Sequence, residues 1–204
     1  PAISPDGARV AFTSDRSGPF EVWMCDRDGT SPVQLTHFGG PFVGTPRWSP
    51  DGRRLVFDAR LDGQADLFTI DVAGGPPTRL TDDPADDLAA SWSHDGASIY
   101  FASSRQGGWR VWKMPAEPAL AEAGGGAAVP LSPPGGFAAH EAPDGRTLYY
   151  TKRDTSGLWR VPAGGGPEAR VLDDLAVEDW GSWAVLPEGL YYLTRSPTAV
   201  RFVD

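Results

Sequence analysis

The sequence predicts an all-β fold of repeated four-stranded antiparallel units, and three observations support this. Glycine and proline supply 25 and 20 of the 204 residues, which leaves few runs long enough for helices. A turn of the type Ser-Pro-Asp-Gly recurs, with closing glycines at 7, 52, 96, 145 and 189, so that copies lie 45, 44, 49 and 44 residues apart. Segments rich in β-branched and aromatic residues alternate apolar and polar positions between the turns. A period in the mid-forties is typical of a β-propeller blade.

Each unit is expected to contribute four strands in a fixed order. One strand precedes the turn, a second follows it with two apolar residues spaced by two, and two more complete the unit. The strands before the turns are expected at 46–49, 90–93, 139–142 and 183–185. Those directly after the turns carry Val10/Phe12, Leu55/Phe57, Ile99/Phe101, Leu148/Tyr150 and Leu190/Tyr192. The third strands are expected at 22–25, 67–70, 111–114, 158–161 and 200–203, and the fourth at 33–36, 78–81, 129–131 and 170–172.

The blades themselves are expected at 1–37, 45–81, 90–132, 137–172 and 180–204. The one long spacing is explained by an Ala/Gly-rich insertion at 116–128, where a short helical turn is expected at 119–123. The fifth blade lacks its outermost strand, and the length amounts to about four and a half units. The chain is therefore interpreted as a segment of a larger propeller, and a closed ring of five blades is the alternative.

The second unit carries the repeat most completely. Pro-Arg-Trp-Ser-Pro-Asp-Gly at 46–52 is followed by Leu-Val-Phe at 55–57, Asp-Leu-Phe-Thr-Ile-Asp at 66–71 and Arg-Leu-Thr at 79–81. This pattern resembles the TolB-type, WD-like β-propeller repeat, and the resemblance extends over the whole chain. It implies that the strand before each turn is innermost in its blade and lines a central channel.

A narrower resemblance concerns the last two units. The segments 157–162 and 180–185 are similar to the propeller regions of bacterial one-component regulators, in which a winged-helix domain precedes the propeller. This resemblance implies a sensory or protein-interaction role in a bacterial regulator.

Charge and composition exclude several classes of function. The net charge of −9 argues against direct nucleic-acid binding and against adsorption to an anionic membrane. No apolar run approaches the roughly 20 residues of a membrane helix. With one cysteine, Cys25, and no paired Cys or His motif, neither a disulfide nor a zinc site is expected. No Gly-x-Ser-x-Gly elbow is present. We therefore expect neither a cofactor nor catalytic machinery in this chain.

Four residues near the ends of inner strands are the first candidates for ligand binding. Arg47, Ser91 and His140 share one position in the inner strands of successive repeats. Because side chains alternate along a strand, those at this position are expected to point toward the channel. Glu141 is at the next position, where the other units have an apolar residue: Ile3, Trp48, Trp92 or Val185. Such departures from a repeated pattern are more common at functional sites. The alternatives are that Glu141 pairs with an arginine such as Arg47, or that it reaches solvent.

Loops at the rim provide the second group of candidates. Asp83, Asp86 and Asp87 belong to the acidic segment 82–87, and Trp109 follows a glycine pair. The acidic segment could hold a divalent cation, but it lacks the spacing of an EF-hand loop, and a solvated structural loop is the favoured interpretation. The recurring Asp-Gly turns are also interpreted as structural.

The function expected from these features is a non-catalytic binding or scaffold module of a larger bacterial protein. Its partner would be a protein, a peptide or a small molecule at the channel mouth, and open blade edges would allow self-association. One alternative is the gating propeller of a prolyl-oligopeptidase-like serine peptidase whose catalytic domain lies elsewhere. A stand-alone five-bladed enzyme or lectin is another. A periplasmic and a cytoplasmic location are both left open.

Overall fold

We describe the protein from a computed structural model, which covers residues 1–40, 42–61, 63–117, 127–195 and 197–204. The helical turn expected at 119–123 lies outside the described residues. The chain divides into two compact units, Pro1–Trp92 and Ser93–Asp204. Each unit is described separately below.

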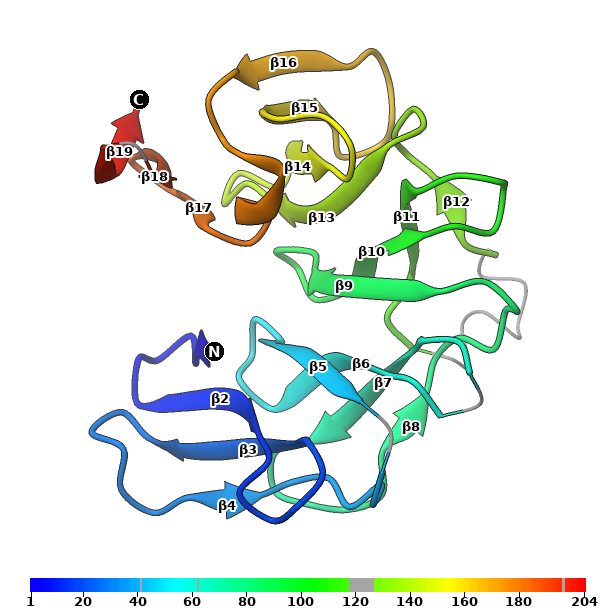
Figure 1. The fold of residues 1–204 in the computed structure, drawn as a ribbon, viewed down its shortest axis with the longest axis vertical. Coiled ribbons are helices and arrows are strands. Elements are labelled where there is room, and N and C mark those ends of the chain that lie inside the picture. The colour runs from blue at the N-terminus through cyan, green and yellow to red at the C-terminus, as the bar shows by residue number, and fades with distance from the viewer. Residues whose placement is uncertain (41, 62, 118–126, 196) are drawn as a thin grey trace. The chain divides into compact units, whose positions relative to one another are not determined.

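Unit 1 contains two complete four-stranded antiparallel sheets and the first strand of a third (Figure 1). In both complete sheets the strands lie side by side in chain order, as in a propeller blade. The bounds are β1 (Ala2–Ile3), β2 (Arg9–Ser14), β3 (Glu21–Asp26), β4 (Val33–Gln34), β5 (Val43–Trp48), β6 (Arg54–Ala59), β7 (Asp66–Asp71), β8 (Thr78–Arg79) and β9 (Asp87–Trp92).

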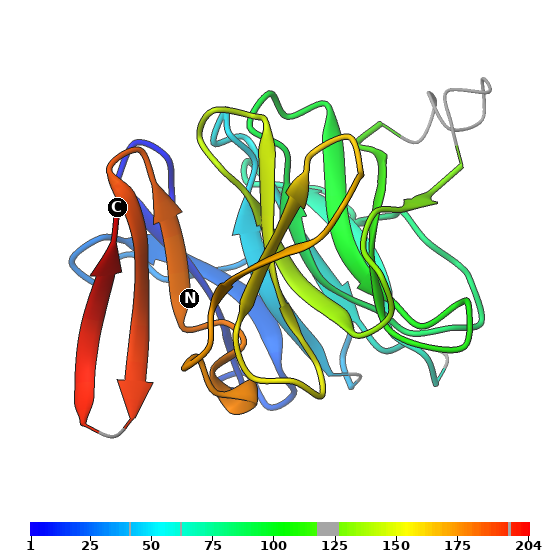
Figure 2. The ribbon, with the colours of Figure 1, turned by 90° about the horizontal axis from the view of Figure 1, so that it is seen from above.

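Unit 2 continues the same pattern. The third sheet has the order β12-β11-β10-β9, the fourth is β13-β14-β15-β16, and the last is the three-stranded β17-β18-β19, whose strands lie side by side in Figure 2. The bounds are β10 (Ser98–Ser103), β11 (Arg110–Pro115), β12 (Val129–Pro130), β13 (Gly136–Glu141), β14 (Thr147–Lys152), β15 (Leu158–Pro162), β16 (Ala169–Leu172), β17 (Trp183–Leu186), β18 (Gly189–Arg195) and β19 (Thr198–Val203). A single 3₁₀ turn, η1 (Val177–Asp179), is the one helical element in the described part of the chain. The prediction of an all-β propeller fold is confirmed.

A pair of aromatic side chains links the second and third strands in each of the first four blades. In each blade an aromatic residue of the second strand lies opposite one of the third. Such cross-strand pairs stabilise a sheet through contact on one face. The pairs are Phe12–Trp23, Phe57–Phe68, Phe101–Trp112 and Tyr150–Trp159. The repeated core therefore follows directly from the repeated sequence.

The outermost strands of the first three blades are shorter than the sequence suggests, for a chemical reason. In blade 2 the backbone N–H of Leu67 donates to the hydroxyl of Thr81 at 3.0 Å, where a continued strand would offer a carbonyl. Thr36 and Ser132 accept the N–H groups of Val22 and Val111 in the same way. A side-chain hydroxyl thus ends the ladder after two residues.

Each complete Ser-x-Asp-Gly turn is closed by its own side chains. The Ser49 hydroxyl donates to Asp51 at 2.6 Å and accepts the N–H of Arg54 at 2.9 Å. Gly52 has φ of 68°, a conformation that favours glycine. The turns at Ser4 and Ser93 repeat these contacts. The contacts agree with the structural interpretation of the turn aspartates.

Candidate functional site

A backbone irregularity recurs at one position of three inner strands. Thr45, Ala89 and Ala138 have φ of 42°, 52° and 28°, values that non-glycine residues rarely adopt. The strand register shifts between Gly44 and Arg47 and between Phe137 and Ala139, as in a β-bulge. Bulges redirect the side chains that follow them. The residues that follow are the predicted binding positions of these strands.

In unit 1 the buried carboxylate of Asp58, on β6, lies beside the bulge of β5. Only 4% of Asp58 is exposed. Its carboxylate accepts hydrogen bonds from the Thr45 hydroxyl and from the backbone of Ala89. Burial raises the pKa of Asp58 above its ordinary value, although both hydrogen bonds and the nearby charge of Arg47 oppose the rise. Burial also lowers the pKa of Arg47, and the Asp58 carboxylate counters this shift.

Arg47 and Ser91 lie on neighbouring inner strands of this unit. Arg47 is half-buried on β5, and its Nη1 donates to the Pro46 carbonyl at 3.3 Å. The Arg47 carbonyl accepts the indole N–H of Trp92 at 3.2 Å, which links β5 to β9. Ser91 is buried on β9. Arg47 is thus beside Asp58, a residue that the sequence reasoning missed. Its signal was present, because Thr13, Ala102, Thr151 and Leu193 occupy the matching position elsewhere.

In unit 2, His140 and Glu141 end the inner strand β13. The His140 ring packs edge-on against Trp183, with ring centroids 4.9 Å apart. Glu141 accepts a hydrogen bond from the Tyr100 hydroxyl and another from the backbone N–H of His94 at 2.6 Å. Burial, together with this carboxylate, raises the pKa of Tyr100. Glu141 also lines a cavity of about 250 Å³ with His94, Asp95 and Lys113.

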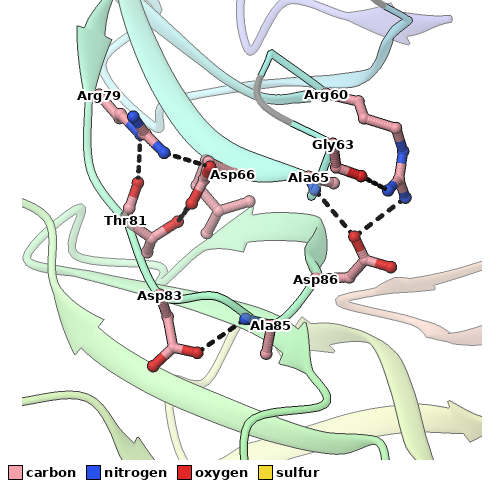
Figure 3. Close-up of polar contacts among 10 residues, drawn as sticks. Arg60, Gly63, Ala65, Asp66, Arg79, Thr81, Asp83, Ala85 and Asp86 are labelled. Atoms are coloured by element: carbon pink, nitrogen blue, oxygen red, sulfur yellow. Dashed lines mark hydrogen bonds and ion pairs between the residues drawn. The ribbon is translucent and has the colours of Figure 1, made fainter.

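Backbone N–H groups and one ion pair hold the acidic rim segment of unit 1 (Figure 3). Asp83 accepts the N–H of Ala85 at 2.9 Å. Asp86 accepts the N–H of Ala65 at 2.8 Å and forms an ion pair with Arg60 at 3.0 Å. Asp87 is fully buried as the first residue of β9 and is not a loop residue. Within the described ranges no group of three His, Cys, Asp or Glu residues could hold a metal ion.

Trp109 belongs to an aromatic cluster in unit 2. Its ring meets Phe137 edge-to-face at 5.4 Å, and Phe137 meets Trp180 in the same way at 5.3 Å. The Arg153 guanidinium lies over both Trp109 and Phe137, at 5.1 and 4.9 Å from the ring centroids. Gly135 links the backbones of Trp109 and Arg153, because its N–H donates to the Trp109 carbonyl and its carbonyl accepts the N–H of Arg153. The sequence reasoning identified only Trp109 of this cluster.

None of the helical segments that the structure describes is long and apolar enough to cross a membrane.

Comparisons with solved structures identify β-propellers. A putative TolB from Agrobacterium tumefaciens superimposes with a TM-score of 0.71 and 19% identity, covering 99% of this chain and 73% of that one. TolB from Acinetobacter baumannii gives 0.78 and 20%, covering 100% of this chain and 51% of that one. A puromycin-hydrolysing peptidase from Mycobacterium tuberculosis gives 0.63 and 18%, covering 86% and 28%. At identities of 18–20%, the TM-scores of these three structures show a shared fold.

A comparison with curated proteins found no match. The family model of the TolB β-propeller domain matches residues 1–196. The chain therefore belongs to the TolB β-propeller domain family.

Proposed function

We propose that this chain is a non-catalytic binding module that contacts a protein or peptide through its inner strands. The observation that carries the proposal is the shared position of Arg47, Ser91 and His140, each two residues after a left-handed bulge residue. A bulge fixes the direction of the side chains that follow it. Ser91 is buried at this register, but Arg47 in unit 1 and His140 in unit 2 are only half-buried, and such polar side chains suit recognition of a polar ligand better than a packed core.

Four acidic residues of the candidate sites give no support to a catalytic role. Glu141, Asp83 and Asp86 accept hydrogen bonds from the protein itself, and Asp58 is buried beneath Thr45. Two carboxylates flanking a substrate would be needed for glycoside hydrolysis. The arrangement favours binding over chemistry.

Peptide selection tests the proposal directly. A random peptide library is displayed against the immobilised chain, and the affinity of enriched peptides is measured by titration calorimetry. Arg47→Ala and His140→Ala should each weaken binding about tenfold, which corresponds to the loss of one charge-assisted hydrogen bond. Arg53→Ala and His37→Ala are matched controls, because both residues are exposed. Failure to enrich any peptide, or equal losses in the controls, would contradict the proposal.

Two larger contexts fit the same module. The chain covers 28% of the mycobacterial peptidase, so the propeller of a serine peptidase is the second candidate. The sensory propeller of a winged-helix regulator is a more specific form of the first candidate, the non-catalytic binding module. The reading frame around this segment separates them, because a Gly-x-Ser-x-Gly elbow would mark the peptidase and a basic winged helix the regulator.

Self-association through the last blade is a further part of the proposal. β19 is the edge strand of its sheet, and Val200 and Phe202 on it are 67% and 49% exposed. An exposed apolar edge pairs readily with another strand. Sedimentation at rising protein concentration would detect it, and Phe202→Lys should suppress it.

A further inference from the structure

Arg153 differs from the other arginines that stack on two rings in this protein. Arg16 lies over Phe12 and Trp23, but its Nε donates to the Ser14 hydroxyl at 3.1 Å. Arg105 lies over Phe101 and Trp112, and its Nε donates to Ser103 at 2.9 Å. The guanidinium of Arg153 has no hydrogen-bond or ion-pair acceptor among the residues that the structure describes, and its side chain is exposed.

Contacts with the two rings restrict this guanidinium. Its Cζ lies 5.1 Å from the centroid of Trp109 and 4.9 Å from that of Phe137, and these two rings are nearly perpendicular to each other. The neighbouring Asp154 carboxylate accepts a hydrogen bond from the Thr155 hydroxyl at 3.0 Å, and no ion pair joins it to Arg153 in the described structure. An arginine held in this way loses little side-chain freedom when it binds a planar anion.

The rings beside Arg153 supply an apolar wall. Trp109 and Trp180 are half-buried and flank the buried Phe137. The Trp180 carbonyl accepts the indole N–H of Trp183 at 2.8 Å, which holds the loop after η1 in place. A rigid aromatic surface next to a free guanidinium matches a carboxylate that has an apolar group beside it.

We propose that Arg153, Trp109 and Trp180 form a binding site for a peptide carboxylate with a neighbouring apolar side chain. The proposal rests on the proposed binding function and names one chemical group of its ligand. The carboxylate would accept two parallel N–H bonds from Arg153, and the apolar side chain would lie on the indoles. An acidic side chain and a chain terminus carry the same group, and the experiment distinguishes them.

The probes are three acetylated dipeptides, two of which each differ from the neutral third in one group. Acetyl-Leu-Asp-amide carries a side-chain carboxylate, acetyl-Leu-Asn with a free carboxyl terminus carries a terminal one, and acetyl-Leu-Asn-amide carries neither. Binding is followed by ¹⁵N NMR of the indole N–H groups of Trp109 and Trp180 in the whole chain. At least one carboxylate probe should shift both resonances saturably at millimolar concentration, and the neutral probe should not. The stronger of the two carboxylate probes identifies the source.

Arg153→Gln should weaken the better probe about tenfold or more. Arg153→Lys keeps the charge and the stacking but lacks the paired donors, so its affinity should fall between those of the wild type and Arg153→Gln. Arg146→Gln is the control, because Arg146 is also exposed and stacks on no ring among the residues that the structure describes. Equal binding of the neutral probe, no shift with any probe, or the same loss in the control would overturn the site. Library peptides that still require Arg47 and His140 would then leave the proposed function intact.

Discussion

The hydroxyl of Tyr100 on β10 donates to the carboxylate of Glu141 on β13, so two successive blades of unit 2 are joined by a side-chain hydrogen bond. The second carboxylate oxygen accepts the backbone N–H of His94 at 2.6 Å. Both oxygens of Glu141 are therefore used within the protein. The unusual acid at this position acts as a tie between blades.

Tyr100→Phe should lower the free energy of unfolding by about 1–3 kcal/mol, because the half-buried Glu141 carboxylate loses a donor. Urea denaturation measures the change. In a double-mutant cycle with Glu141→Ala the two losses should not add, since the residues share one bond. Tyr149→Phe is the matched control, because no side-chain hydrogen bond joins Tyr149 to the described residues. Additive losses would mean that the bond contributes nothing to stability.

Asp58→Asn should change how stability depends on pH. Burial raises the pKa of Asp58 in the folded state above the ordinary 3.8, so the folded state binds the proton more tightly than the unfolded chain. Asp58 therefore contributes favourably to the free energy of unfolding below pH 3.8, and this contribution is lost as the pH rises through the folded-state pKa. The asparagine variant should gain stability relative to the wild type between pH 4 and neutrality. Urea midpoints across this range provide the measurement.

Asp51→Asn serves as the control of opposite sign. The hydrogen bond from Ser49 and then that from the Arg53 backbone lower the pKa of Asp51. Its contribution is present above the ordinary value of 3.8 and is lost as the pH falls through the folded-state pKa. The variant should therefore be less stable than the wild type near neutrality and similar to it in acid. Two profiles with the same slope would refute both assignments.

The turn of blade 4 lacks a hydroxyl that the first three blades have. Ala142 occupies the place of Ser49, and Asp144 retains only the bond from the Arg146 backbone, at 2.9 Å. Ala142→Ser should restore two hydrogen bonds and raise the free energy of unfolding by about 0.5–1.5 kcal/mol. Ser49→Ala should lower it by a similar amount. Thermal unfolding of both variants tests the prediction, which fails if Ala142→Ser is destabilising.

The sequence was informative where contacts are local or repeated. The Asp-Gly turns and the aromatic pairs, such as Phe57 and Phe68, recur at one spacing, so the blades could be predicted without a structure. The bulges could not, because Thr45 and Ala89 are not residues that usually mark positive φ. The partners of Asp58 depend on these bulges, so the sequence marked this acid only by its contrast with Thr13, Ala102 and Thr151 and did not show what it contacts.

The remaining site residues were missed for a related reason. Arg153 and Trp109 are separated by more than forty positions and are brought together through the backbone of Gly135. An arginine after a strand and a tryptophan after a glycine pair carry no shared pattern in the chain. Only the packing of β13 against its neighbours shows that Phe137 and Trp180 complete the cluster.

The acidic segment of unit 1 should behave as a structural loop. Asp86 accepts the N–H of Ala65, so Asp86→Ala should expose that amide and speed its hydrogen exchange (Figure 3). The ion pair with Arg60 is partly exposed and should add little to stability. Exchange measured by NMR on the Ala65 amide reports the change. The wild-type melting temperature should not respond to added Ca²⁺.

Asp83→Ala is the matched control for this loop. Asp83 bonds only the Ala85 N–H two residues away, so its removal should leave the exchange of the Ala65 amide unchanged. A rise in melting temperature with Ca²⁺ that disappears in both variants would place a cation between the two carboxylates and contradict the structural role. Faster exchange at Ala65 in Asp86→Ala alone would show that the carboxylate is already occupied by the backbone. The hydrogen bonds of the loop, and not its formal charge, would then account for its acidic sequence.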